Sequence, residues 1–323
     1  MNVILMILCL AGGFVLLVKG ADLFVDGACA ISEKLKIPAY LVGLTVVALG
    51  TSLPEAAVSI TASIQGSNEI AIGNVIGSNT FNTLVVLGAS ALIAPVAVKK
   101  NILKRDFPFC IFITAVLLIL MITLNGGDTY AISRVGGVIL LVLFTAFMTF
   151  SIVSAKKTAL PEIADNIAEK VPKKEMSALK CVLLVVLGIA GVIAGGELTV
   201  YGAKSLALMA GLSEKVVALT VVAIGTSLPE LVTSIVAARK KQNDIAVGNV
   251  IGSNIFNILF ILGISAAISP IPTDVATMID GVILTGFMVI TFIFALFKKK
   301  ITRIEGLVMI LLYVAYTVYL LVR

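Results

Sequence analysis

The sequence contains no histidine and no tryptophan, and only 13% of its 323 residues are charged. Without histidine, the chain cannot build a Ser-His-Asp triad, a histidine-ligated zinc or haem site, or a histidine proton relay. Soluble domains carry about 25% charged residues, so this composition cannot cover a soluble surface. The four cysteines form no CxxC pair, and three of them lie in apolar runs, which predicts packing rather than a disulfide framework or a metal cluster.

Long apolar runs are what the sequence has in abundance, with 59% hydrophobic residues and a mean hydropathy of +1.14. A helix needs about 20 apolar residues to cross the hydrocarbon of a bilayer. The first run has no Lys or Arg before Lys19, so it is predicted to be a membrane span rather than a signal peptide. We therefore expect an all-α polytopic membrane protein with ten transmembrane helices, near residues 1–18, 38–64, 69–94, 107–124, 132–154, 178–200, 213–238, 245–269, 278–297 and 304–322.

The net charge of +6 reflects the placement of Lys and Arg in the connectors between these runs. If the connectors alternate sides, one side holds 20 of the 24 basic residues, and the other holds only Arg134, Lys204, Lys215 and Arg323. The positive-inside rule then predicts ten spans with both termini extracellular, and no nucleic-acid partner is needed to explain the charge. The charged segment 155–177 is predicted to be a cytoplasmic linker, with room for one surface helical turn, between five-helix units at 1–154 and 178–323.

The chain contains an internal duplication with an offset of 175 residues. GLTVVALGTSLPE at 43–55 matches ALTVVAIGTSLPE at 218–230, and EIAIGNVIGSNTFNTL at 69–84 matches DIAVGNVIGSNIFNIL at 244–259. Each copy holds five predicted spans. Because five is odd, the second copy must enter the membrane from the opposite side, which predicts two inverted repeats. Transporters commonly have this architecture, with the binding site at the repeat interface, although a duplicated channel is an alternative.

Each copy places one glutamate, Glu55 or Glu230, inside an apolar run. A carboxylate at membrane depth is costly and usually marks an ion pathway or a binding site. Hydroxyl side chains lie three and four residues earlier and so share its helix face: Thr51, Ser52, Thr226 and Ser227. Pro54 and Pro229 remove helical hydrogen bonds, so the carbonyls of Ala48 and Ala223 are expected to face a cavity.

The second repeated block adds a polar stripe in each copy. We expect four of its side chains to be ligands: Ser78, Asn82, Ser253 and Asn257. The other asparagines, Asn74, Asn79, Asn249 and Asn254, are more typical of hydrogen bonds between helices. Carboxylate, hydroxyl, amide and carbonyl oxygens suit Ca²⁺ or Na⁺, and a loose oxygen cage suits Ca²⁺ better than Mg²⁺. Two glutamates balance one Ca²⁺ or two Na⁺, which is a physical basis for antiport, and no cofactor is expected.

The paired GTSLPE and GNVIGSN–xFN motifs resemble the α-repeats of the cation/calcium exchanger superfamily, specifically the sodium/calcium exchanger branch, over nearly the whole chain. The resemblance implies an inverted 5+5 fold, exchange of Ca²⁺ against Na⁺, and sliding of the long first and sixth helices past an eight-helix core. By motif position it implies that the twelve residues named above are the metal ligands. The short linker resembles the compact prokaryotic members, which implies a prokaryotic plasma membrane.

Two departures bear on the coupling ion. Some relatives, including potassium-dependent ones, have aspartate at the position of Asn257, which argues against K⁺ cotransport here. Proton-coupled relatives tend to have a GNAxE-like motif in place of GTSLPE, which favours Na⁺ over H⁺. A H⁺- or K⁺-coupled exchanger is the nearest alternative, a passive cation channel is the second, and an intramembrane enzyme is disfavoured because the chain lacks a GxSxG elbow and paired aspartates.

Overall fold

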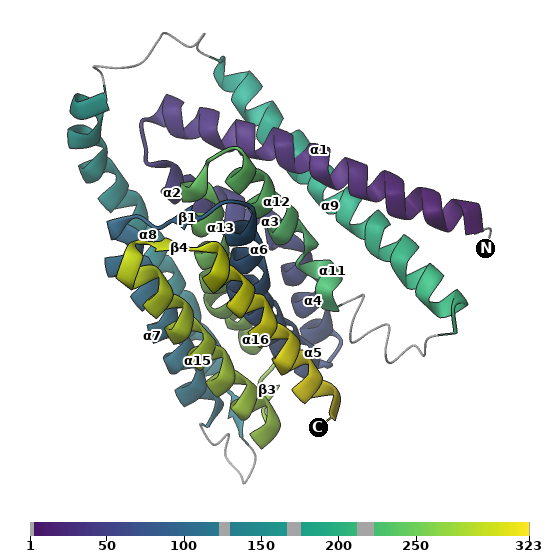
Figure 1. Ribbon diagram of the computed structural model, residues 1–323. Coiled ribbons are helices and arrows are strands. Elements are labelled where there is room, and N and C mark those ends of the chain that lie inside the picture. Colours follow the sequence, from purple (N-terminus) through teal and green to yellow (C-terminus); the bar gives the residue numbers. More distant parts are fainter. Residues whose placement is uncertain (1–2, 123–129, 167–175, 212–222, 323) are drawn as a thin grey trace.

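The computed structural model describes residues 3–122, 130–166, 176–211 and 223–322, and most of them are helical (Figure 1). Up to the linker, the elements are α1 Val3–Leu35, α2 Ala39–Val42, η1 Gly43–Val47, α3 Ala48–Thr51, α4 Leu53–Ile64, α5 Asn68–Phe81, η2 Asn82–Val86, α6 Leu87–Ile93, β1 Val96–Ala97, η3 Ile102–Asp106, α7 Phe107–Met121, β2 Ala131–Ile132 and α8 Arg134–Asn166, where η denotes a π-helix. They continue with α9 Ala178–Met209, α11 Ala223–Thr226, α12 Leu228–Arg239, α13 Asn243–Phe256, η5 Asn257–Ile261, α14 Leu262–Ile268, β3 Ile271–Pro272, α15 Val275–Lys298, β4 Lys300–Ile301 and α16 Arg303–Val322.

Seven of the described helical segments are long and apolar enough to cross a membrane. A bent pair, Ala39–Thr51 with Leu53–Ile64, passes the same test together and makes an eighth. The chain is therefore an integral membrane protein with seven to eight such spans in its described part. Of the two other predicted spans, one contains the 15-residue α7, and the other, 213–238, includes residues 213–222, which lie outside the described residues. Ten spans and the inversion of the repeats stay predictions.

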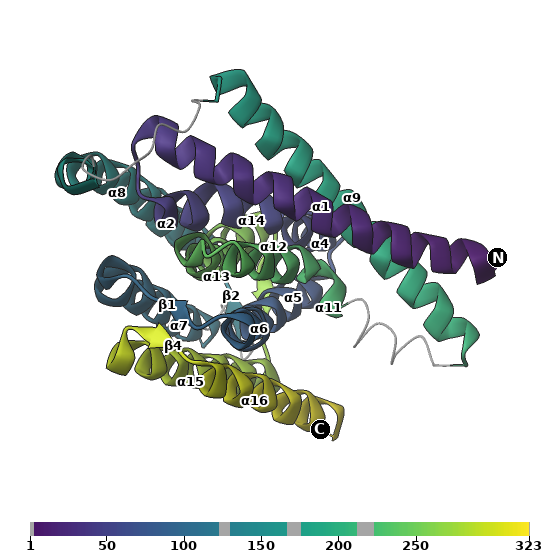
Figure 2. The ribbon, with the colours of Figure 1, turned by 45° about the horizontal axis from the view of Figure 1, so that its top comes forward.

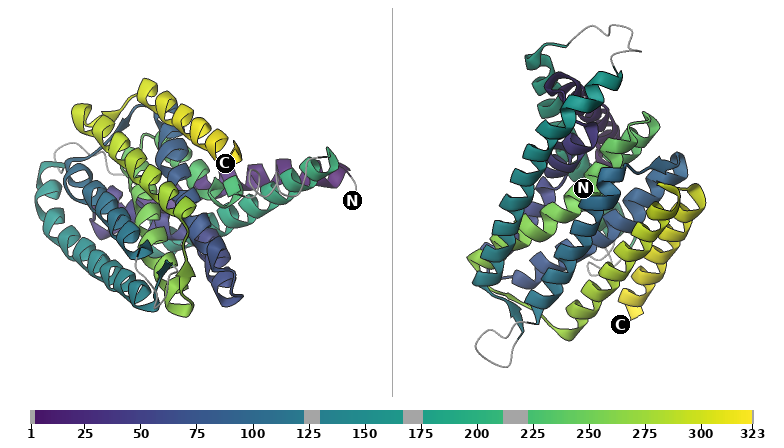
Figure 3. Two further views of the ribbon diagram at one scale, coloured as in Figure 1. Left: turned by 90° about the horizontal axis from the view of Figure 1, so that it is seen from below. Right: turned by 90° about the vertical axis from the view of Figure 1, so that its left-hand side faces the viewer.

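Each copy begins with a long helix, α1 in the first and α9 in the second. These two helices pack against each other across one side of the molecule (Figures 1 and 2). They extend beyond the bundle, as Figure 3 shows. The sequence-based ends at residues 18 and 200 are wrong, because α1 continues to Leu35 and α9 to Met209. The 33 residues of α1 give a length of about 50 Å, more than the roughly 30 Å of hydrocarbon, so charged residues beyond the apolar run do not end the helix.

Glycines allow the close approach of these two helices. They recur every seven residues at Gly13, Gly20 and Gly27 of α1, and again at 188, 195 and 202 of α9. A Cβ atom at Gly20 would lie 2.6 Å from the backbone of Gly191. No side chain fits between the two backbones there, so the helices contact each other directly.

Short contacts tie the connectors together at both ends of the bundle. Strand β1 pairs antiparallel with β4, and Lys99 Nζ lies 2.9 Å from Asp244 Oδ2. The sequence assigns all three of the connectors involved to the basic side. Strand β2 pairs with β3, and Asn68 Nδ2 donates to Ser269 Oγ at 2.9 Å, in connectors assigned to the other side. Each contact therefore joins segments that the predicted topology places on the same side.

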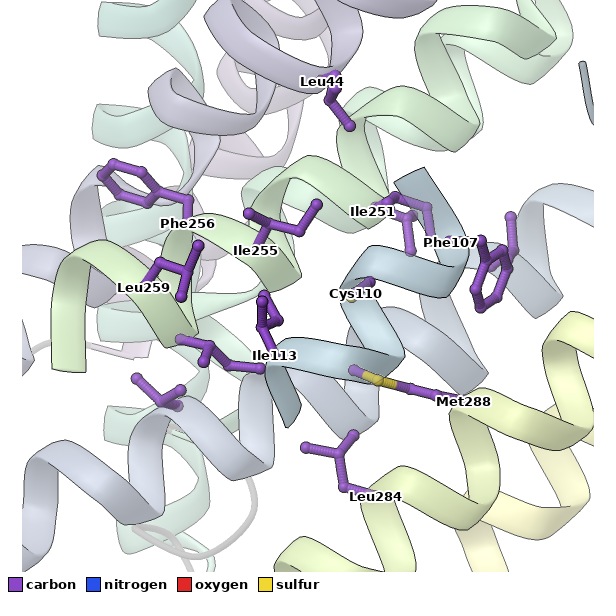
Figure 4. Packing of buried hydrophobic residues seen from close by; sticks show 14 of the residues in the cluster. Leu44, Phe107, Cys110, Ile113, Ile251, Ile255, Phe256, Leu259, Leu284 and Met288 are labelled. Carbon is purple, nitrogen blue, oxygen red and sulfur yellow. The ribbon is translucent and has the colours of Figure 1, made fainter. Parts of the chain in front are cut away.

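Residues of α7, α13 and α15 pack together in the larger of two hydrophobic clusters. Figure 4 shows Cys110 and Ile113 of α7 between Ile251 and Ile255 of α13 and Met288 of α15. Cys110 and Cys181 are buried, in agreement with the packing role expected for the cysteines, and Cys9 and Cys29 are partly buried. In the segment predicted to be a linker, α8 continues as far as Asn166, which is more than the single turn expected, and residues 167–175 lie outside the described residues.

Candidate ion-binding site

The conserved spacing within each duplicated block produces a break in a helix. Ser52 separates α3 from α4 with φ −86° and ψ 8°, and Ser227 separates α11 from α12 with φ −92° and ψ 6°. The proline that follows two residues later lies in the first turn of the next helix, where a missing N–H costs no hydrogen bond. The helices before and after Ser52 differ in direction by 50°. Glu55 and Glu230 thereby lie in the first turn of α4 and α12, near the positive end of each helix dipole.

The two glutamates are fully buried, and each is held by a serine of the other copy. Ser52 Oγ donates to Glu230 Oε1 at 2.8 Å, and Ser227 Oγ donates to Glu55 Oε1 at 3.1 Å. All four side chains have 0% exposure. This reciprocal arrangement brings both helix breaks and both carboxylates into one interior region.

A second group of oxygens surrounds the first break. Thr51 Oγ1 lies 3.3 Å from the carbonyl oxygen of Ala48, 3.5 Å from Ser253 Oγ, and donates to Asn249 Oδ1 at 3.1 Å. The carbonyl of Ala48 is not freed by the break as expected, because the Ser52 N–H donates to it at 3.0 Å. It lies instead within this hydroxyl group, with Ser253 Oγ also 3.5 Å away.

The two predicted amide ligands, Asn82 and Asn257, are each the first residue of a π-helix, η2 and η5. Such π-bulges widen the helix locally and often occur at functional sites. Asn257 Nδ2 donates to Asn79 Oδ1 at 2.9 Å, which leaves the Asn257 carbonyl oxygen to face elsewhere. Both asparagines have 0% exposure.

Several buried oxygens of this region have no hydrogen-bond partner among the described residues: Glu55 Oε2, Glu230 Oε2, Ser78 Oγ, Asn82 Oδ1 and Asn257 Oδ1. A buried polar atom without a partner carries a desolvation cost, which a bound ion would remove. Ca²⁺ takes six to eight oxygen ligands, carboxylates and amide carbonyls among them. Together with the hydroxyl and carbonyl oxygens around Thr51, the donor set is chemically suited to Ca²⁺ or Na⁺.

For two of the twelve predicted ligands the structure gives less information. Thr226 is only half-buried in α11, and Ala223 is the first residue of α11 but its side chain lies outside the described residues. The asparagines assigned to helix packing do make such contacts. Asn74 Nδ2 donates to Ser59 Oγ at 2.9 Å, and Asn249 Nδ2 donates to the equivalent Ser234 Oγ at 3.0 Å.

A third buried carboxylate lies outside this region and is neutralised differently. Asp106, with 0% exposure, accepts hydrogen bonds from Arg105 Nε at 2.7 Å and from a second guanidinium nitrogen at 3.2 Å. Neither Glu55 nor Glu230 has a Lys or Arg partner in the part of the chain that the structure describes. The protein thus gives Asp106 a permanent countercharge and leaves the two glutamates without one.

Comparison with known proteins extends these observations. A family model described as sodium/calcium exchanger protein matches residues 5–153 and 180–322. The chain is 36% identical to the putative antiporter CaxA of Alkalimonas amylolytica, over 94% of this chain and 95% of the relative. It is 32% identical to the sodium/calcium exchanger MaX1 of Methanosarcina acetivorans, over 95% and 96%. The solved structure of the sodium-calcium exchanger NCX_Mj, soaked without Na⁺ and Ca²⁺, is similar with a TM-score of 0.84 and 33% identity, and covers 99% of this chain and 100% of that one.

Proposed function

The chain belongs to the sodium/calcium exchanger protein family, a family of membrane cation exchangers, and we propose that it is an antiporter that moves Ca²⁺ against Na⁺ by alternating access. The relatives with which it aligns almost end to end include one named sodium/calcium exchanger and one named putative antiporter. Their names support Na⁺ as the coupling ion and exchange as the mode of transport. The family is one of transporters and not of enzymes.

The observation that carries the proposal is the pair of buried glutamates without a fixed countercharge. A buried carboxylate is strongly unfavourable unless it is paired or coordinates a metal. Asp106 shows that this fold can supply an arginine where a permanent pair is wanted. At Glu55 and Glu230 the serine hydroxyls orient the carboxylates but leave the negative charge in place. An exchangeable cation is therefore the species that neutralises them, and the carrier has to hold one before its site can close.

We assign twelve residues to the ion site, by carboxylate, hydroxyl, amide or backbone oxygen: Glu55, Glu230, Thr51, Ser52, Thr226, Ser227, Ser78, Ser253, Asn82, Asn257, Ala48 and Ala223. Contacts around the two helix breaks support seven of them: Glu55, Glu230, Ser52, Ser227, Thr51, Ser253 and the carbonyl of Ala48. Ser78, Asn82 and Asn257 are supported by burial and by a side-chain oxygen without a hydrogen-bond partner among the described residues. The two carboxylates balance one Ca²⁺ or two Na⁺. Competition of these ions for one set of oxygens couples their movements.

We further propose ten spans in two inverted repeats, with both termini extracellular in a prokaryotic plasma membrane. The connector contacts support this topology, because the two strand pairs and the ion pair between Lys99 and Asp244 each join segments that it places on the same side. The duplicated elements support the repeats, since α4 and α12 have 12 residues each, and α5 and α13 have 14 each.

Transport by reconstituted protein tests the proposal. Proteoliposomes are loaded with Na⁺ and diluted into Na⁺-free medium that contains tracer Ca²⁺, and the assay is repeated with a proton or a potassium gradient in place of Na⁺. We expect Ca²⁺ uptake only with the outward Na⁺ gradient. Uptake driven by protons or potassium would replace Na⁺ by that ion, and uptake that ignores every gradient would indicate a channel and refute exchange.

A further inference from the structure

A lysine at one end of the core holds the long helix α1. Lys240 is the residue that caps the C-terminus of α12, the helix that carries Glu230. Its Nζ lies 2.7 Å from Asp26 Oδ1 and 3.2 Å from Asp22 Oδ1, and it donates to the backbone carbonyl of Asp22 at 3.0 Å. The two aspartates are one turn apart on α1, so one ammonium group bridges two carboxylates of the neighbouring helix.

We call Lys240, Asp22 and Asp26 the clamp residues. Partial burial lowers the pKa of Lys240, but the hydrogen bonds and charges of Asp26 and Asp22 outweigh this effect and raise the pKa above its usual value. Lys240 therefore stays protonated at neutral pH, where a lysine with a pKa near 10 is already almost fully charged.

The duplication shows that this feature belongs to one half only. The 175-residue offset places Gln65 at the position of Lys240, and Glu197 and Tyr201 at the positions of Asp22 and Asp26. A glutamine has no charge, so it cannot form an ion pair with a carboxylate. The end of α4 that corresponds to the end of α12 thus lacks the chemistry for an ionic clamp on α9.

The packing of the two long helices also differs between the two halves, and the more extensive contact is the one that includes the clamp residues. Helix α1 lies along α12 and α2, whereas α9 contacts α3, α11 and α12. Between α9 and α4, which are both described in full, there is no contact as extensive as that between α1 and α12. In a carrier built from inverted repeats, the opposite access state is the one in which the two halves exchange these roles. The described arrangement is then one of the two states, and α1 on α12 is its distinguishing contact.

From these observations we propose that Lys240, with Asp22 and Asp26, is a one-sided ionic clamp that favours the described state over its opposite. The inference builds on the proposed exchange by alternating access. All three side chains are partly exposed, at 30%, 40% and 57%, so each ion pair contributes modestly. Removal of the clamp is expected to shift the balance of the two states by a factor of about three to ten.

The substitution Lys240→Gln tests the clamp, because it installs the residue that the other copy has at this position. Half-saturating Ca²⁺ concentrations are measured separately at the two membrane faces, in vesicles sorted by orientation. A shift in state populations lowers the apparent affinity at one face and raises it at the other, and the two factors multiply to the shift in the equilibrium between the states. Arg239→Gln is the matched control, since it removes the same charge from the adjacent exposed residue and should leave both values unchanged.

The double substitution Asp22→Asn and Asp26→Asn should reproduce the effect of Lys240→Gln, and combining all three should add little more. Unchanged affinities at both faces, or a change in the same direction at both, would overturn the clamp. Absence of Na⁺-dependent Ca²⁺ flux in the unmodified protein would instead refute Na⁺ as the coupling ion, and flux that ignores every gradient would refute exchange.

Hydrogen exchange gives a readout that needs no transport. Without the clamp, the peptide that covers residues 236–243 should exchange faster in the Lys240→Gln protein than in the unmodified protein or the Arg239→Gln control, because α1 leaves this end of α12 more often. Equal exchange in all three would refute the clamp, whatever the transport assay shows.

Discussion

Replacing Glu230 by glutamine removes one of the two charges of the proposed ion site and little else. The amide has nearly the same shape as the carboxylate. Its carbonyl oxygen can still accept the hydrogen bond that Ser52 donates to Glu230 at 2.8 Å in the unmodified protein. Two unit charges 4 Å apart attract by about 4 kcal/mol at an effective dielectric constant of 20, so a divalent ion loses about 8 kcal/mol of attraction. The amide avoids the several kcal/mol needed to desolvate a carboxylate, which returns part of this loss.

A net loss of at least about 3 kcal/mol remains, which corresponds to a Ca²⁺ affinity more than a hundredfold weaker. Attraction for a monovalent ion falls by half as much, so Na⁺ binding should weaken less than Ca²⁺ binding. Isothermal titration and tracer flux on Glu230→Gln, and on the equivalent Glu55→Gln, measure these changes. Glu69→Gln is the control, because Glu69 is an exposed carboxylate in the first turn of α5. Robust Ca²⁺ transport by either site variant, in a protein that inserts and purifies normally, would refute the assignment of the site.

Four further substitutions test hydrogen bonds at the site and two packing or ion-pair contacts elsewhere in the protein. Ser52→Ala and Ser227→Ala each remove one hydrogen bond to a buried carboxylate, which is worth about 1.5–3 kcal/mol. The apparent ion affinity measured by tracer flux should therefore change tenfold or more. An unchanged affinity would contradict a role of these serines in orienting the carboxylates. Gly20→Ala places a Cβ 2.6 Å from the α9 backbone and should cost about 1–3 kcal/mol in thermal unfolding, whereas Gly12→Ala, with no described atom within 4 Å, should cost almost nothing. Asp106→Ala leaves its arginine partner without a countercharge and should destabilise the fold by about 3 kcal/mol while the Ca²⁺ to Na⁺ preference of the remaining folded protein stays the same.

The residues of the candidate site could be proposed from the sequence because the same motif occurs twice in it. A glutamate inside an apolar run is a strong signal by itself, and its recurrence at an offset of 175 residues removes most of the ambiguity. The hydroxyl residues around each glutamate follow from helical spacing, and Pro54 and Pro229 predict the breaks observed at Ser52 and Ser227.

The pairings across the two copies could not be predicted in the same way. Helical spacing places Ser52 beside Glu55, but the structure shows Ser52 donating to Glu230, a contact that depends on how the two copies pack. The π-helices that begin at Asn82 and Asn257 also have no local signature, since the surrounding residues are ordinary apolar ones. The full length of α1 could not be predicted from hydropathy, because the apolar run ends at the first charged residues. The helical backbone hydrogen bonds continue beyond them to Leu35.

The two copies match at the residues of the proposed ion site and differ at the contact that we propose favours one access state. Glu55 and Glu230 match, and their serine partners match, so the interior chemistry is the same when the two halves exchange roles. Such a site presents similar oxygens to an ion from either side, as a carrier of one cargo in two directions requires. Lys240 has no such counterpart, because Gln65 stands at its position. Residues at the ion site cannot favour one access state without also changing the ion affinity. A preference that leaves ion binding intact therefore has to come from unmatched contacts at the edge of the core. Lys240 makes one such contact.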